Sequence, residues 1–276
     1  MADLLVLDGF SPLPQGPTLS LSLASGKSLC ILGPAGGGKT RFLRTALGLE
    51  RIGQGRATSN SPVSHAGDAG WPRRATPLSV ARRGAGSKRA NLAGEALYAT
   101  GLWDCQNTSV DQLSRTQRGL AELLSCLSCE TGLMVVDGQF DSLDPWSFRK
   151  VMEAFRKRLN VGYGLIAVTN RPELAVHFDH LVVMQSSGVR FVGTVEELLR
   201  LHGEAVIEVE TQNQSGVRAL VAPFEISIAE TDRGVVLRAA EGQQLAARLL
   251  SEGYGDIKMV VLKEPTVESA LEELLR

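Results

Sequence analysis

The sequence of 276 residues contains no apolar run that approaches the roughly 18–20 residues a helix needs to cross a membrane. Its first residues carry no basic segment followed by an apolar core, so we expect no secretory signal. Positive and negative charges almost cancel to a net charge of −1, which excludes a general attraction of the chain to nucleic acid or anionic lipid. A role at a membrane would therefore require a separate membrane subunit.

Cysteine is also scarce, with four residues in the whole chain. Cys126 and Cys129 form a C-x-x-C pair, but no second pair accompanies it, as a zinc site would require. The residues around the pair are mostly apolar and have helical spacing, which favours small core residues over a metal or redox site. This cysteine usage fits a reducing cytosol.

The sequence does contain one glycine-rich loop, which lies between an apolar strand at 28–32 and a helix that begins near residue 39. The loop reads Gly33, Pro34, Ala35, Gly36, Gly37, Gly38, Lys39, Thr40. In this pattern backbone N–H groups cradle phosphates, the lysine reaches the β- and γ-phosphates, and the threonine hydroxyl binds Mg2+. A turn that only links strand to helix would leave Lys39 and Thr40 unexplained. The loop therefore predicts nucleoside triphosphate binding, and it does not by itself predict hydrolysis.

The order of elements predicts an α/β chain of two domains, 1–203 and 204–276. In the first domain, apolar strands alternate with helices, which indicates a largely parallel sheet covered on both faces. Residues 53–94 are rich in Gly, Pro, Ser and Arg and are expected to be mostly loop. The second domain has a β-α-β-β-α-β order with an added helix, which predicts a small α+β ferredoxin-like domain.

An acidic residue ends the apolar run at 132–137. Asp137 follows Lys39 by 98 residues, and in phosphate-loop ATPases an aspartate at the end of such a strand helps to hold Mg2+ through water. The alternative is a strand-end residue that only caps a turn. Because the phosphate loop is present, we expect Asp137 and Thr40 to share the metal.

At this point the sequence resembles the ABC-type ATPases, the nucleotide-binding subunits of ABC transporters. Residues 113–118 occupy the place of the family's L-S-G-G-Q signature, and Gln117 lies 20 residues before Asp137. Residues 141–145 resemble the D-loop. The resemblance implies a P-loop NTPase domain with a mixed sheet and a helical subdomain, with ATP and Mg2+ as cofactors.

Further positions take their expected roles from the same resemblance. Phe10 lies 29 residues before Lys39, where the family places an aromatic ring against adenine. The signature residues that would meet the partner's nucleotide across a dimer are Ser114, Arg115, Thr116 and Gln117. The segments 179–184 and 193–199 resemble the family's closing strand and helix. The tail at 264–268 resembles the accessory C-terminal domain of the ABC-2 exporter group.

Four departures from the family pattern fall at hydrolytic positions. Gly138 stands where the family has the glutamate that polarises the attacking water, and Asn170 replaces the switch histidine. The loop that should carry a glutamine has Ala66 or Asp68 at that place, depending on the alignment. Arg115 and Thr116 replace both signature glycines. Because general-base catalysis is worth roughly 10²–10⁴-fold, we expect weak or absent hydrolysis by the isolated chain and name no catalytic residue.

The sequence thus predicts a catalytically degenerate ATP-binding subunit of an ABC transporter. The resemblance implies a heterodimer with an active ATPase subunit and a membrane permease, on the cytoplasmic side of the membrane, with no nucleic acid partner. One alternative is an active ATPase with a substitute base, Asp141 or Asp68. Others are a soluble ABC protein without a membrane partner and a small-molecule kinase. Segments 113–117 and 141–145 argue against the kinase.

Overall fold

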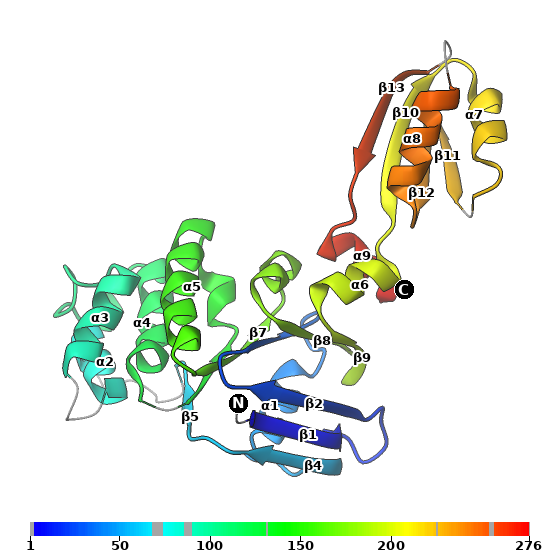
Figure 1. The fold of residues 1–276 in the computed structure, drawn as a ribbon. Helices are drawn as coiled ribbons and strands as arrows, with labels where there is room; N and C mark the ends of the chain where they lie inside the picture. Colours follow the sequence, from blue (N-terminus) through cyan, green and yellow to red (C-terminus); the bar gives the residue numbers. More distant parts are fainter. Residues whose placement is uncertain are drawn as a thin grey trace. The chain divides into compact units, whose positions relative to one another are not determined.

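The computed structural model describes residues 3–67, 74–85, 90–130, 132–224, 226–253 and 257–275. The chain separates into two compact units, Met1–Gly193 and Thr194–Arg276, each of which is described by itself (Figure 1). The helix at 195–202, which the sequence assigns to the end of the first domain, is part of the second unit, and a domain boundary after residue 203 stays a prediction. Within the described residues, no helix combines the length and apolar character needed to cross a membrane.

The first unit contains nine strands, five α-helices and three short 3-10 helices among its described residues. The strands are β1 (Asp3–Ser11), β2 (Leu19–Ala24), β3 (Ser28–Leu32), β4 (Gln54–Ser59), β5 (Val63–His65), β6 (Leu133–Asp137), β7 (Gly164–Thr169), β8 (His180–Gln185) and β9 (Gly188–Gly193). The α-helices are α1 (Lys39–Ala46), α2 (Pro77–Ala85), α3 (Ala90–Thr100), α4 (Arg115–Ser128) and α5 (Pro145–Asn160). The 3-10 helices are η1 (Val110–Gln112), η2 (Gln139–Ser142) and η3 (Pro172–His177).

A six-stranded sheet in the order β5-β6-β7-β3-β8-β9 forms the centre of this unit. All neighbouring pairs are parallel except β8 and β9, which form an antiparallel hairpin. Every residue of β3 is buried, as expected for a central strand that reads Ser-Leu-Cys-Ile-Leu. The predicted largely parallel sheet is confirmed. It brings the carboxyl ends of β3, β6 and β7 to one edge.

A smaller antiparallel sheet has the order β2-β1-β4. Its strand β4, together with β5 and α2, lies in the stretch 53–94 that the sequence predicts to be mostly loop, so that prediction is wrong for these segments. The strand β4 pairs with β1 along one edge, and most of its side chains are exposed. An exposed edge strand needs no apolar alternation, which explains why the sequence pattern does not reveal it.

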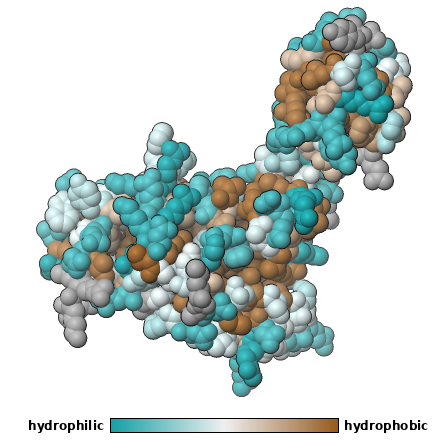
Figure 2. Space-filling model, in the orientation of Figure 1, coloured by the Kyte–Doolittle hydropathy of each residue, from teal (hydrophilic) through white to brown (hydrophobic). Residues whose placement is uncertain are grey.

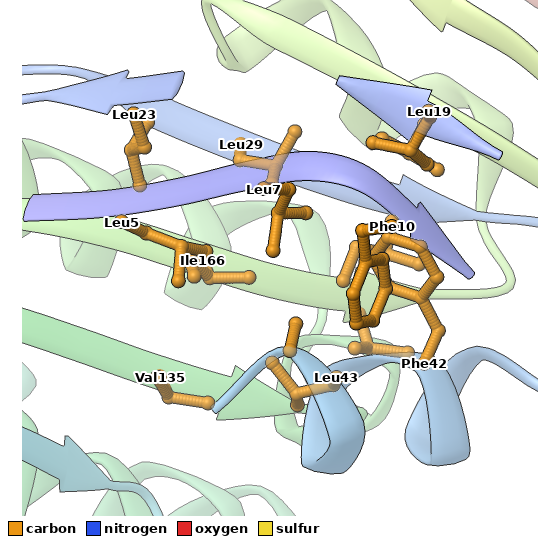
Figure 3. Packing of buried hydrophobic residues seen from close by; sticks show 14 of the residues in the cluster. Leu5, Leu7, Phe10, Leu19, Leu23, Leu29, Phe42, Leu43, Val135 and Ile166 are labelled. Carbon is orange, nitrogen blue, oxygen red and sulfur yellow. The ribbon is translucent and has the colours of Figure 1, made fainter. Parts of the chain in front are cut away.

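The core of the first unit joins the two sheets through helix α1 (Figure 3). Leu5 and Leu7 of β1 belong to one buried cluster with Ile166 and Val135 of the parallel sheet, and Figure 3 shows Leu5 beside Ile166. Leu43 of α1 belongs to the same buried cluster, so the helix that begins at the phosphate loop is anchored by its apolar face.

Helices α2, α3 and α4 pack against one another and form the helical part of this unit, and α5 packs against α3 and α4 (Figure 1). The buried residues of α5 recur every three or four positions: Phe148, Val151, Met152, Phe155 and Leu159. This spacing gives the helix one apolar face. The view in Figure 2 shows hydrophilic side chains over its exposed side.

The second unit holds a four-stranded antiparallel sheet in the order β11-β12-β10-β13. Its elements are α6 (Val195–His202), β10 (Ala205–Thr211), α7 (Gln214–Val221), β11 (Ser227–Thr231), β12 (Gly234–Ala239), α8 (Gly242–Glu252), β13 (Ile257–Lys263) and α9 (Val267–Leu274). From β10 to β13 the order is β-α-β-β-α-β, as the ferredoxin-like prediction requires. Residues of β10, β12, α7 and α8 form a buried cluster that is separate from the core of the first unit.

Candidate nucleotide-binding site

The loop 33–40 lies where the sequence predicts it, between β3 and α1. Gly38 has φ +86°, a left-handed conformation that non-glycine residues rarely adopt, and a Cβ at Gly33 would lie 2.1 Å from the carbonyl oxygen of Met184. Glycine is therefore required at positions 33 and 38. The loop is also supported by the β8–β9 turn, because the Ser187 N–H donates to the Gly37 carbonyl at 3.0 Å.

A cleft of about 490 Å³ opens over this loop. It is lined by Ala35, Gly36, Gly37, Gly38, Lys39, Thr40, Arg41, Asp137, Gly138, Asp141, Val168, Thr169 and Asn170. The cleft thus brings together the phosphate loop with the ends of β6 and β7, which are far apart in the sequence. Of the predicted site residues, Lys39, Thr40, Asp137, Gly138 and Asn170 all meet here.

Lys39 is 7% exposed as a residue, and its ammonium group has three oxygen acceptors. Its Nζ lies 2.8 Å from the Gly33 carbonyl, 2.7 Å from the Pro34 carbonyl and 2.6 Å from Asn170 Oδ1. Burial lowers the pKa of the Lys39 amine, while the carboxylates of Asp141 and Asp137 oppose that shift. Since an ammonium has three N–H donors, a phosphate that binds Lys39 must take the place of one of these acceptors.

Thr40 and Asp137 lie side by side at the opening of the cleft. The Thr40 hydroxyl donates to Asp137 Oδ1 at 3.1 Å. Burial raises the pKa of Asp137, and the Thr40 hydroxyl and the Lys39 charge counteract it. A hydroxyl and a carboxylate next to a phosphate loop are the hard oxygen ligands that Mg2+ uses.

These two residues fit an Mg2+ ion that is shared with a nucleotide. Among the described residues, no group of three or more His, Cys, Asp or Glu side chains could hold a metal ion alone. A metal here would therefore complete its shell with phosphate oxygens and water, as Mg2+ in nucleotide sites commonly does.

Gly138 follows Asp137 and also lines the cleft, but it has no carboxylate to offer. Its φ is +87°, and no heavy atom lies within 4 Å of the position that a Cβ would take. The Gly138 N–H donates to the Val168 carbonyl at 3.0 Å, which ties the residue to β7. There is space for a side chain at this position, and the backbone conformation is the obstacle.

Asp141 accepts hydrogen bonds from the next strand of the sheet with both carboxylate oxygens. The Thr169 hydroxyl donates to Asp141 Oδ1, and the Asn170 N–H donates to Asp141 Oδ2 at 3.1 Å. A third hydrogen bond lies two residues after Asp141, where Arg171 Nη1 donates to the Leu143 carbonyl at 2.8 Å. The segment after β6 is therefore joined to the segment after β7.

The signature residues 114–117 begin helix α4 and are not among the described residues that line the cleft. Ser114 caps the helix, since its Oγ accepts from the Gln117 N–H at 3.2 Å and its own N–H donates to Gln117 Oε1 at 3.0 Å. Arg115 and Thr116 follow on the first turn, and Arg115 is exposed. The first turn of α4 is thus a capped helix end that carries a cation where the family has glycine.

Phe10 does not have the position that the resemblance implies. Its ring is 0% exposed and packs edge-on against Phe42, with 5.2 Å between ring centroids (Figure 3). A stacked adenine needs an open ring face, so the expected adenine contact at Phe10 is wrong. The register of β1 against β2 shifts between Leu7 and Phe10, which turns the ring into the core.

No glutamine follows β5, as the sequence predicts for the loop after that strand. Ala66 is buried there, and Asp68 lies outside the described residues. A different glutamine lies beside Ala66, because Gln139 Nε2 donates to the Ala66 carbonyl at 3.3 Å. Gln139 Oε1 is buried without a hydrogen-bond partner among the described residues. The sequence gives no signal for this contact, which joins the ends of β5 and β6.

The C-x-x-C pair is part of the core, as the apolar surroundings predict. Cys126 and Cys129 are both buried and are not in a disulfide, and burial raises the pKa of Cys126 to about 12. Burial and the raised pKa of Cys126 fit a core residue better than a metal ligand or nucleophile, because both of these act as the thiolate.

Comparison with known proteins places the chain in a family. No protein-family model matches it. The chain is 32% identical over 192 residues to the taurine import ATP-binding protein TauB of Pseudomonas aeruginosa. The alignment covers 63% of this chain and 73% of TauB. It is also 25% identical over 270 residues to the uncharacterized ABC transporter ATP-binding protein YhaQ of Bacillus subtilis. That alignment covers 90% of this chain and 89% of YhaQ.

A solved structure of an ATP-binding subunit of an ABC transporter has the same fold. It aligns with a TM-score of 0.60 and 17% identity over 72% of this chain and 92% of the other. This likeness shows a shared fold, and the family assignment comes from the identity to TauB. The chain belongs to the family of ABC transporter ATP-binding proteins.

Proposed function

We propose that the chain binds Mg-ATP as the nucleotide-binding subunit of an ABC transporter and hydrolyses it weakly or not at all. The observation that carries this proposal is the composition of the cleft. Lys39, Thr40 and Asp137 provide a phosphate and Mg2+ site, while Gly138 and Asn170 stand where the family has its hydrolytic glutamate and histidine. Asn170 is a neutral amide that can hydrogen-bond but takes up no proton at ordinary pH.

The same proposal includes the partners. ABC ATPases form head-to-tail dimers, and two copies of this chain would make two sites without a general base. We therefore propose a heterodimer with an active ATP-binding subunit and a membrane permease, which would hold the chain at the cytoplasmic face of the membrane. TauB and the L-cystine import protein TcyN of Bacillus subtilis are named as import proteins, whereas the tail of this chain resembles the exporter group.

Two measurements on the purified chain test the nucleotide part of the proposal. Titration calorimetry with ATP and Mg2+ is expected to show binding that Lys39→Met abolishes and that Lys157→Met, a change at an exposed lysine of α5, leaves intact. Steady-state phosphate release is expected to stay near the background of Lys39→Met. Turnover at the rate of an ordinary ABC ATPase would overturn the proposed degeneracy.

Co-purification from native membranes tests the partners. A second ATP-binding subunit and a permease are expected to accompany the chain. Recovery of the chain without any membrane protein, under conditions that keep a control ABC complex intact, would favour a soluble ABC protein instead. Recovery with a permease but only with further copies of itself would contradict the heterodimer.

A further inference from the structure

The four-stranded sheet of the second unit ends in two unlike edge strands, β11 and β13. Strand β11 spans only five residues, and most of its side chains are exposed. A side chain of helix α7 also reaches it, because Arg218 Nη2 donates to Glu230 Oε1 at 2.7 Å. A short, charged edge of this kind resists the addition of another strand. We therefore expect no further pairing at β11.

Strand β13 forms the opposite edge and differs on each of these points. It spans seven residues, and the stretch 259–262 reads Met-Val-Val-Leu, with Met259 49% exposed. Among the described residues β13 pairs with β10 alone, and Figure 1 shows it on the outer side of the sheet beside that strand. The backbone groups on its outer side therefore offer a template for one more strand.

Both faces of β13 carry apolar side chains. Val260 and Leu262 pack against the buried cluster that the sheet forms with helices α7 and α8. Met259 and Val261 alternate with them along the strand, so they lie on the other face of the sheet. A strand added at this edge would thus find apolar neighbours on both faces.

The sequence of β13 matches itself in the antiparallel direction. When two copies meet with Val261 opposite Val261, Val260 lies opposite Leu262 twice, and Met259 lies opposite the aliphatic stem of Lys263. Directly opposed residues of neighbouring strands lie on the same face of a sheet, and such apolar pairs stabilise it. This register uses residues 259–263, which are the five residues of β13 that pair with β10 without a shift.

The charges of β13 do not oppose this pairing. Lys263 is matched within its own chain, because its Nζ lies 2.5 Å from Glu208 Oε1. Lys258 lies at the register shift of the strand, outside the stretch 259–263. In this register no two like charges stand directly opposite each other, an arrangement that would otherwise destabilise the pair.

We propose that β13 pairs with β13 of a second copy of this chain, antiparallel and about a two-fold axis at Val261, so that two four-stranded sheets become one. A two-fold contact needs a single surface that is complementary to itself, as β13 is. The inference goes beyond the proposed function, because it involves no residue of the phosphate-loop cleft and needs no nucleotide. A complex would then hold two copies of this chain besides an active ATP-binding subunit.

Sedimentation equilibrium of the full chain without nucleotide tests this pairing. Wild type is expected to show a monomer–dimer equilibrium. Val261→Lys is expected to weaken the dimer by about fivefold or more, because each lysine meets the lysine of the second copy, and Val261→Glu is expected to act alike through two carboxylates. An equimolar mixture of the two variants is expected to recover the dimer, because lysine then meets glutamate.

Matched variants at the other edge serve as controls. Ala229→Lys places the same charge on an exposed position of β11 and is expected to leave the dimer unchanged. Val261→Cys is expected to form a covalent dimer on mild oxidation, since Cα atoms of opposed residues lie roughly 4.5–5.5 Å apart, within disulfide range. Ser227→Cys on β11 is expected to stay at the wild-type background. Thermal unfolding shows which variants fold, and Val261→Cys decides the question if the charged variants do not.

Three outcomes would overturn the inference. They are a wild-type chain that stays monomeric at its highest soluble concentration, a folded Val261→Lys that dimerises as wild type does, and a mixture of charged variants that recovers no dimer. A dimer that appears only with Mg-ATP and ignores Val261 would also reject it while leaving the proposed function standing. Failure of wild type to bind Mg-ATP would reject the proposed function and leave the strand pairing as it is.

Discussion

The side-chain oxygen of Asn170 lies 2.6 Å from the ammonium nitrogen of Lys39. In this chain the residue at the switch position thus contacts the phosphate loop directly. The contact needs only an acceptor, which a neutral imidazole nitrogen could also supply. Restoring the family residue therefore changes this contact little.

Asn170→His is accordingly expected to bind Mg-ATP and to remain without turnover, because Gly138 still supplies no general base. Steady-state phosphate release from the variant and from wild type checks this. A rise of tenfold or more would show that the histidine alone was missing and that water can be activated by another group.

Replacing Gly138 is expected to be costly for the fold. Its φ of +87° suits glycine, so Gly138→Glu should destabilise the chain by roughly 1–2 kcal/mol, although no atom lies within 4 Å of the new Cβ. Gly138→Asn is the comparison, because asparagine tolerates the left-handed region better. Urea unfolding should show a smaller loss for Asn than for Glu. Equal stability of Gly138→Glu and wild type would mean that the backbone relaxes there at no cost.

Phe10 is expected to matter for stability and not for the nucleotide. Its buried ring packs on Phe42, so Phe10→Ala should lower the free energy of unfolding by about 3–5 kcal/mol. Phe10→Leu, which keeps most of the apolar volume, should fold and bind ATP as wild type does. A folded Phe10→Leu that binds ATP tenfold more weakly would return the ring to a role in adenine binding.

Asp137 is expected to make stability depend on pH. Burial raises its pKa in the folded chain, so between the unfolded and folded pKa values the folded state binds more protons than the unfolded state. Its contribution therefore becomes more favourable as pH falls through that window and less favourable as pH rises. Asp137→Asn should remove this part of the dependence and be more stable than wild type at neutral pH without Mg-nucleotide.

Chemical denaturation at several pH values between 4 and 8 measures the effect, with Asp111→Asn as an exposed control. A parallel pH profile for Asp137→Asn and wild type would contradict it. The same variant should weaken Mg-ATP binding, since it removes a charged ligand from beside Thr40.

The inner strands of the central sheet were predictable because nearly all of their residues are buried, whereas the partly exposed edge strand β5 was not. Strands such as β3 and β6 read as continuous apolar runs, and the loop after β3 has a pattern with a known mechanism. The same reasoning found Asp137 beside Thr40. A run of apolar residues and a short motif can both be recognised in the sequence itself.

What the sequence did not reveal depends on backbone pairing and on the direction of single side chains. The strand β4 is polar and exposed, so only its pairing with β1 identifies it. The ring of Phe10 has the family spacing, but the register shift before it directs the ring inward. The hydrogen bonds that connect Asp141 to Lys39 through Asn170 join residues about a hundred positions apart, and no local sequence pattern predicts them.

The turn between β8 and β9 has a consequence for the order in which the protein is made. The Ser187 N–H supports the phosphate loop, and β3 pairs with β8, some 150 positions later in the chain. A growing chain on the ribosome that has not yet produced this hairpin has the motif but lacks its support. The capacity to hold a nucleotide is thus a late event in synthesis, and a nascent chain truncated before residue 180 should have none.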